Sequence, residues 1–257
     1  MIHTFDSHIH LDLIERFSPT TAIGRAPSCA FVPGVRPADT RDALRRMGDD
    51  PRLTFGAAWH PWHIPDGEPR MDELRALMPE VCAVGETGLD HARHRDKARR
   101  ERAARWFVAH IELAVASGKP LVVHCVRAHG ACLELLRTHH ASRVGGVVHG
   151  FIGSLETARE YARLGFAVGM GPAIARARHA ARVVREHDAR WLLAETDAPF
   201  ARALREREQA GHGFGIEAVL EHMALLRKEE PDRVRARNTT VGGRLGLCHT
   251  GTPAHTS

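Results

Sequence analysis

Short apolar runs alternate with longer segments of helical periodicity along most of this chain. The apolar runs predict eight strands, at Ile2–Ser7, Cys29–Val32, Leu53–Ala58, Val81–Gly85, Leu121–His124, Gly146–His149, Phe166–Met170 and Trp191–Glu195. The longer segments predict helices between and after these strands, at Pro37–Met47, Met71–Met78, Asp96–Ser117, Ala131–His139, Leu155–Arg163, Ala173–His187, Ile216–Arg227 and Asp232–Arg237. Strands that alternate with helices are typical of β-α units around a parallel sheet.

The number of strands and the length of the chain together favour one fold class. Eight β-α units in 257 residues predict an α/β protein with a (β/α)8 TIM-type barrel. An open, doubly wound sheet is the alternative. No low-complexity segment or linker interrupts the pattern, so we expect a single domain over residues 1–257, with an irregular stretch at Ala198–Gly215.

Composition limits the partners and the cellular compartment that we expect for the protein. The formal net charge of +5 permits an anionic partner such as nucleic acid but does not require one. The N-terminus shows no signal-peptide pattern, and no apolar segment is long enough to span a membrane. The five cysteines are scattered without Cys-x-x-Cys spacing. We therefore expect a cytoplasmic protein with reduced thiols, no membrane partner and a monomeric state.

Polar residues that can bind metals close several of the apolar runs. His8 and His10 lie two residues apart at the end of the first run, so on an extended strand both would point to the same side. Later runs lead into Glu86, His124, His149 and Asp197. In a parallel barrel every strand ends on the same face, so we expect these side chains to converge there.

The spacing and chemistry of these six residues predict a metal centre. Glu86 and His124 are 38 residues apart, and His124 and His149 are 25 apart, each close to one β-α unit. Four imidazoles and two carboxylates suit Zn²⁺, and Mn²⁺, Co²⁺, Ni²⁺ or Mg²⁺ stay open. Six ligands exceed one tetrahedral site, which favours two ions bridged by Glu86. We expect a metal-bound hydroxide as nucleophile, with Glu86 and Asp197 as catalytic residues.

The sequence also resembles the TatD-type metal-dependent hydrolases, which are deoxyribonucleases within the amidohydrolase-like superfamily. The resemblance is carried by six segments in order, Asp6–Asp12, Gly56–Pro61, Gly85–Asp90, Val123–Cys125, Val148–Ser154 and Glu195–Phe200. It implies metal contacts at His8, His10, Glu86, His124, His149 and Asp197. It also implies that His60, in the segment Gly-Ala-Ala-Trp-His-Pro, lies beside a substrate phosphate.

Four segments depart from the pattern of that family, and they bear on the substrate more than on the metal. After His124-Cys125 the family usually has Arg-Asp-Ala, whereas here the arginine is shifted to Arg127, which we assign with His60 to substrate binding. Gly150 and Ile152 replace a cysteine and a serine. The segments Ala201–Gly215 and Asn238–Leu247 match the family's later elements poorly or loosely.

The leading functional hypothesis is a metal-dependent phosphodiesterase, a DNase that acts on single-stranded or frayed DNA ends, with RNA as the less favoured nucleic acid. A basic run from Arg93 to Arg102 could attract a phosphodiester backbone, although a solvated helix face is the commoner reason for such a run. Trp59, Trp62 and His63 could stack a base or pack in the core. Two alternatives are hydrolysis of a small C–N or ester substrate and a non-catalytic metal-binding partner protein.

Overall fold

The computed structural model describes residues 4–13, 28–200 and 215–248. Eight parallel strands pair in chain order and form a nearly closed barrel. The strands are β1 (Phe5–Asp6), β2 (Cys29–Val32), β3 (Leu53–Ala57), β4 (Ala83–Asp90), β5 (Leu121–Val126), β6 (Gly146–Val148), β7 (Phe166–Met170) and β8 (Leu192–Ala194). The predicted barrel is therefore confirmed, and the open sheet is wrong.

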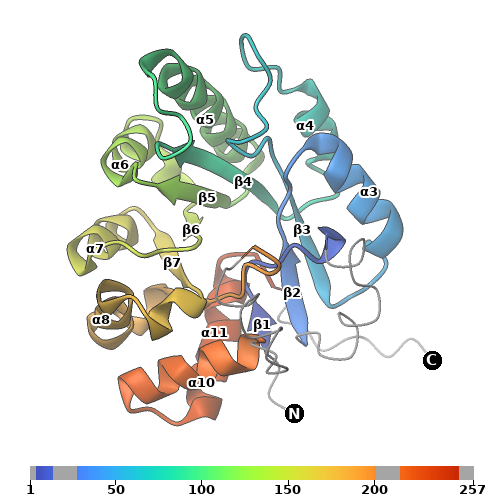
Figure 1. Cartoon of the computed structure of the whole chain (residues 1–257). Coiled ribbons are helices and arrows are strands. Elements are labelled where there is room, and N and C mark those ends of the chain that lie inside the picture. The colour runs from blue at the N-terminus through green and yellow to red at the C-terminus, as the bar shows by residue number, and fades with distance from the viewer. Residues whose placement is uncertain (1–3, 14–27, 201–214, 249–257) are drawn as a thin grey trace.

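Helices surround the strands on the outside of the molecule (Figure 1). They are α3 (Pro37–Met47), α4 (Asp72–Leu77), α5 (Lys97–Ser117), α6 (His129–Thr138), α7 (Leu155–Arg163), α8 (Arg178–Glu186), α10 (Ile216–Arg227) and α11 (Pro231–Arg244), with 3₁₀ turns η2 (Ala141–Arg143), η3 (Pro172–Ala175) and η4 (Ala189–Trp191). Among the described residues, no helix is long and apolar enough to cross a membrane.

Local sequence signals fix the ends of the longest helix, α5. The Asp96 side chain accepts a hydrogen bond from the Arg99 amide and so caps the first turn. Gly118 ends the helix with φ +65°, in the left-handed conformation that glycine adopts without a steric penalty. The prediction for this helix is thus met to within one residue.

Two apolar layers hold the barrel together. Inside it, side chains from most of the strands fill the space between the walls, among them Phe5, Phe31, Val122 and Leu193. A larger layer packs the outer face of the sheet against the helices. Because the interior is filled, the chemistry of the barrel is confined to the ends of its strands and to the loops that follow them.

The first and last strands are joined by few backbone contacts. Ser7 N–H donates to Ala194 C=O at 3.1 Å, and Asp197 N–H donates to His8 C=O at 2.9 Å. The buried side-chain amide of Asn238 on α11 lies between the two strands. Its Oδ1 accepts from Ala194 N–H and its Nδ2 donates to Phe5 C=O, both at 2.7 Å. The side chain therefore replaces a missing rung of the β1–β8 ladder.

Two strand predictions need correction. The described part of the first strand is Phe5–Asp6, so His8 and His10 follow it in a bend and loop rather than extending it. The fourth strand runs through Glu86 to Asp90 instead of ending at Gly85. A register shift between Gly85 and Thr87 leaves Glu86 without a partner on β5. The pattern missed this bulged extension because its polar residues interrupt the apolar run.

Two helix predictions also need correction. The segment Ala173–His187 is divided into η3 and α8, because Ala177 adopts an extended conformation between them. The last helix continues beyond Arg237 to Arg244. Gly242 and Gly243 disfavour a helix by propensity, but a Cβ on Gly242 would lie 2.3 Å from the Phe5 ring, so close packing on β1 requires glycine there.

Candidate metal centre

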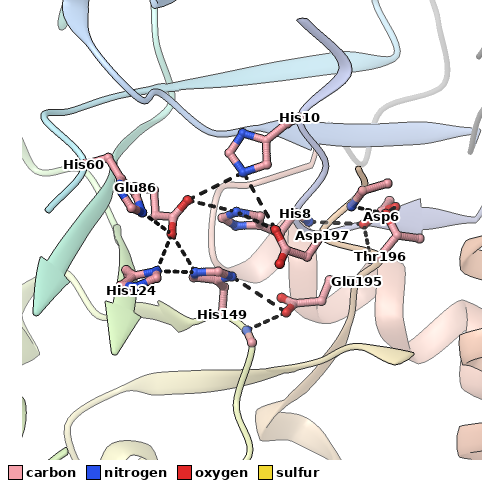
Figure 2. A network of polar contacts seen from close by, with 12 residues as sticks. Asp6, His8, His10, His60, Glu86, His124, His149, Glu195, Thr196 and Asp197 are labelled. Atoms are coloured by element: carbon pink, nitrogen blue, oxygen red, sulfur yellow. Dashed lines mark hydrogen bonds and ion pairs between the residues drawn. The ribbon is translucent and has the colours of Figure 1, made fainter. Parts of the chain in front are cut away.

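The six predicted ligands lie together at the carboxyl ends of the strands, around the Glu86 side chain (Figure 2). They come from the segments that follow β1, β6 and β8 and from β4 and β5 themselves. Glu86 is 2% exposed, and its position in the bulge of β4 turns its carboxylate into the centre of this group. Residues separated by most of the sequence thus meet at one carboxylate.

Four imidazoles lie close enough to contact the Glu86 carboxylate directly. Its Oε1 lies 2.6 Å from His149 Nε2, 2.7 Å from His124 Nδ1 and 3.1 Å from His60 Nε2. Its Oε2 lies 3.2 Å from His8 Nε2. Imidazole nitrogens therefore lie beside both oxygens of Glu86. A carboxylate that bridges two cations would be surrounded by metal-binding nitrogens in this way.

His10 and Asp197 extend the group on the side of β1 and β8. His10 Nε2 lies 3.6 Å from Glu86 Oε2 and 3.8 Å from Asp197 Oδ1, while His8 Nε2 lies 3.9 Å from Asp197 Oδ1. These separations are too long for direct hydrogen bonds. A cation about 2 Å from each donor atom fits between atoms at such distances, so the donor set suits a metal.

Within the part of the chain that the structure describes, three groups of ligand atoms could each hold an ion. Their members lie within 4.8 Å of one another, and the groups are His8–Glu86–His149, His8–His10–Asp197 and His60–Glu86–His124. Glu86 belongs to two of the groups, and so does His8. The geometry is thus compatible with more than one ion, with Glu86 between them.

The hydrogen-bond partners of His60 and His124 determine whether each ring can bind a metal or donate a hydrogen bond. Trp62 N–H donates to His60 Nδ1 at 3.1 Å, so the neutral ring carries its hydrogen on Nε2 and donates towards Glu86. Both nitrogens of His124 face carboxylates, which only accept: Nε2 lies 3.3 Å from Asp90 and Nδ1 lies 2.7 Å from Glu86, so a cation at Nδ1 would take the place of a proton there. His124 therefore suits a metal, and His60 suits an acceptor such as a phosphate oxygen.

The charges of the site are strongly coupled. Burial raises the pKa of Glu86, but the facing imidazoles, His149 first, outweigh it and hold the pKa well below its usual range. Burial lowers the pKa of His149, yet the charge of Glu86 outweighs it and raises this pKa to about 10. Burial raises the pKa of Asp197 to about 6. Positive charge is thus favoured beside Glu86, where a cation would lie.

Carboxylates that sequence reasoning left unassigned support the histidines from behind. The Asp6 side chain accepts from His8 N–H at 3.2 Å and from the Thr196 hydroxyl at 2.6 Å, so it links the ends of β1 and β8. Glu195 Oε1 lies 3.9 Å from His149 Nδ1. Asp90, like Asp6 and Glu195, belongs to a segment that carried the family resemblance, which was the available signal for all three.

A pocket with a volume of about 170 Å³ opens above these side chains. Its lining includes two aromatic side chains at the rim, Trp62 and Phe200, which are 41% and 43% exposed, and one arginine, Arg36. Arg127 is exposed on the turn after β5 and is not part of this lining. The segment Ala201–Gly215 falls almost wholly outside the described residues.

Comparison with known proteins gives the same assignment along nearly the whole chain. Residues 5–243 match the family described as TatD related DNase. The uncharacterized metal-dependent hydrolase YabD of Bacillus subtilis (strain 168) is 27% identical over 252 residues, 94% of this chain and 98% of YabD. The 3'-5' ssDNA/RNA exonuclease TatD of Edwardsiella piscicida is 38% identical over 133 residues, 50% of each chain.

A solved structure shares the barrel as well. The crystal structure of YjjV, a TatD homolog from Escherichia coli K12, matches with a TM-score of 0.80 at 26% identity, covering 95% of this chain and 98% of that chain. The resemblance found in the sequence is therefore confirmed. With the family matched over most of its length and its fold shared with a solved homologue, this chain belongs to the TatD-related DNase family of metal-dependent hydrolases.

Proposed function

We propose that this hydrolase cleaves phosphodiester bonds of DNA at single-stranded or frayed ends, with two divalent ions held by His8, His10, Glu86, His124, His149 and Asp197. The observation that carries the proposal is the Glu86 carboxylate, which meets imidazole nitrogens at both of its oxygens. The mixture of nitrogen and oxygen donors favours Zn²⁺ over Mn²⁺, Co²⁺, Ni²⁺ or Mg²⁺.

The residues of the site divide the work of hydrolysis. Divalent ions bound there would supply Lewis acidity towards a phosphoryl oxygen and would lower the pKa of water. Glu86, whose side chain is 3% exposed, fixes the ligand geometry from inside the barrel. The Asp197 side chain is 27% exposed and faces the pocket, so we assign to its carboxylate the acceptance of a proton from the attacking water.

The pocket supports a nucleic acid substrate. His60 lies at the floor of the pocket with its Nε2–H towards Glu86, and Arg36, which pairs with Asp39 at 2.8 Å, is a cation in the pocket wall; their N–H groups suit a phosphate that enters the pocket. The exposed rings of Trp62 and Phe200 suit an unpaired base, because stacking on aromatic side chains needs a base that has left its duplex. The name of the Edwardsiella piscicida relative, an exonuclease for single strands, agrees with this substrate class.

The test begins with protein purified without an affinity tag, whose metal content is measured before any assay. Oligonucleotides labelled at the 5′ or 3′ end are then digested, because the labels report both activity and direction. Glu86→Ala and Asp197→Asn should reduce turnover by at least a hundredfold and leave the far-UV circular dichroism unchanged, since both side chains lie above the packed layers of the barrel. Chelation should remove activity reversibly.

Asp49→Asn is the matched control, because Asp49 is an exposed carboxylate outside the pocket. It should hydrolyse the oligonucleotides at the wild-type rate. Near wild-type turnover by Glu86→Ala at saturating metal would contradict the assignment. Cleavage of small C–N or carboxylic ester substrates, with oligonucleotides left intact, would move the function to the alternative class of hydrolase.

A further inference from the structure

Asp90, at the end of β4, contacts two parts of the site with a single oxygen. Its Oδ2 accepts a hydrogen bond from Trp62 Nε1 at 2.7 Å and lies 3.3 Å from His124 Nε2. Its Oδ1 accepts the backbone N–H groups of Ala92 and Arg93, both at 2.9 Å. Asp90 is 3% exposed and does not line the pocket, so it can act on a substrate or a metal only through its neighbours.

The first neighbour is His124, whose ring Asp90 orients. A carboxylate that accepts from Nε2–H fixes the tautomer that leaves Nδ1 free to bind a cation, and it raises the basicity of that nitrogen. Asp90 therefore supports His124 as a ligand through the ring nitrogen that faces away from Glu86.

The second neighbour is Trp62, an exposed ring in the wall of the pocket. Its indole lies edge-on to the His60 ring, with centroids 5.1 Å apart and an interplanar angle of 87°. The Arg93 guanidinium covers the indole at 4.7 Å from the ring centroid. With its Nε1–H bound by Asp90, the ring is restrained in one orientation although 41% of the residue is exposed.

We propose that Asp90 is a positioning residue that joins the metal centre to the aromatic wall of the pocket, because one carboxylate oxygen orients both His124 and Trp62. Its role towards a base on Trp62 rests on the proposed function. Its role towards the metal does not. The test therefore measures metal affinity and the restraint of Trp62 in protein that is not turning over, so a failed DNase assay would leave both results interpretable.

Asp90→Ser is the most informative variant. A serine hydroxyl can still accept the backbone N–H groups of residues 92 and 93 in a turn, but it offers no second oxygen to His124 and Trp62. The affinity of the metal-free protein for Zn²⁺, measured by competition with a chelating dye, should fall by about 10- to 100-fold. Quenching of Trp62 fluorescence by acrylamide, isolated by subtracting the signal of Trp62→Phe, should increase at least twofold.

Two control variants separate this role from a general loss of structure. Asp96→Ser replaces a nearby carboxylate that caps α5 and makes no contact with the metal centre, and serine also caps helices well. It should change neither measurement. Trp62→Phe keeps an aromatic ring but removes the indole N–H, so its Zn²⁺ affinity should stay within about twofold of wild type.

Asp90→Asn is the second test variant, to be used if circular dichroism shows that Asp90→Ser does not fold. Its amide oxygen can still accept the backbone N–H groups of residues 92 and 93. The side chain lacks the charge that orients His124, so the same loss of Zn²⁺ affinity is expected. Zn²⁺ affinity within twofold of wild type together with unchanged quenching of Trp62 in the folded variant would overturn the proposal. A loss of affinity without a change in quenching would overturn the coupling to the pocket wall.

Discussion

His110 is a buried histidine outside the metal centre that supports the segment leading into it. It lies on α5, where Nδ1–H donates to Trp106 C=O at 2.6 Å and Nε2 accepts from Trp59 N–H at 3.0 Å. The hydrogen bond from Trp59 requires the neutral ring, because a protonated Nε2 cannot accept, and it fixes the residue before His60. Burial accordingly lowers the pKa of His110 to about 4.

This pKa predicts a pH-dependent contribution to stability. Above pH 6.5 the ring is neutral in the folded and the unfolded chain, so the contribution is complete. Between pH 6.5 and about 4 only the unfolded chain binds the proton, so the free energy of unfolding falls with falling pH. From pH 7 to pH 5 the loss due to His110 should be about 2 kcal/mol.

Urea unfolding of wild type and His110→Asn at both pH values, with a chelator present, measures this loss. The chelator removes metal from both proteins, so the titration of the site histidines is common to them. The difference in unfolding free energy between the two proteins should shrink by about 2 kcal/mol on going to pH 5. A difference that stays constant across this range would contradict the burial of a neutral ring.

Among single residues, the sequence was sufficient to predict the site residues that lie at the end of a strand. Glu86, His124 and His149 could be predicted as site residues because each follows apolar residues of a strand, and strand ends share one face. Asp90 could not be assigned in the same way, since its partners are set by the tertiary placement of Trp62 and by the tautomer of His124. No periodic pattern in the sequence indicates contacts of this kind.

At the level of elements, the structure separates the cations of the basic run Arg93–Arg102, at the start of α5, by the groups that they contact. Arg99 and Arg102 on this helix face the carboxylates of Asp96 and Asp66. Arg93 precedes the helix and covers Trp62 at the rim of the pocket. The run therefore divides into five cations that bind protein groups, by ion pairs (Lys97, Arg99 and Arg102) or by hydrogen bonds to backbone carbonyls (Arg95 and Arg100), and one cation, Arg93, that is placed to meet a substrate.

We expect these two groups to differ in their effect on nucleic acid binding. Arg93→Gln should reduce the slope of log KM against log salt concentration by about 0.7 for a single-stranded oligonucleotide, because one phosphate contact is lost. The double variant Arg99→Gln/Arg102→Gln should leave the slope unchanged. Turnover of bis-p-nitrophenyl phosphate serves as the control for intact chemistry, and a larger change of slope in the double variant would restore the whole helix face as the binding surface.

For the whole molecule, the alternation of apolar runs and helices was sufficient to predict the barrel. The contacts that close that barrel were beyond the pattern, because they join residues from the two ends of the chain. Ser7 meets Ala194, and Asn238 reaches both strands from α11. The loose family motif after Asn238 marked this residue, but only the packing of Gly242 on Phe5 explains how α11 comes close enough.

Asn238 should therefore be worth more to stability than a typical helix residue. Asn238→Ala leaves the buried Ala194 N–H and Phe5 C=O without partners, at about 1–3 kcal/mol each, so the free energy of unfolding should fall by about 2–6 kcal/mol. Thr240→Ala, an exposed position on the same helix, should cost less than about 0.5 kcal/mol. Urea unfolding of the metal-free proteins gives both values.

The same variant tests whether closure of the barrel positions the site. His8 and His10 follow β1 and Asp197 follows β8, so loosening the junction between these strands should separate their ligand atoms. We expect Zn²⁺ affinity of Asn238→Ala to fall about tenfold at temperatures where the variant is fully folded, with Thr240→Ala unchanged. Full Zn²⁺ affinity in a destabilised Asn238→Ala protein would show that Asp6 and Thr196 hold the two segments together without help from α11.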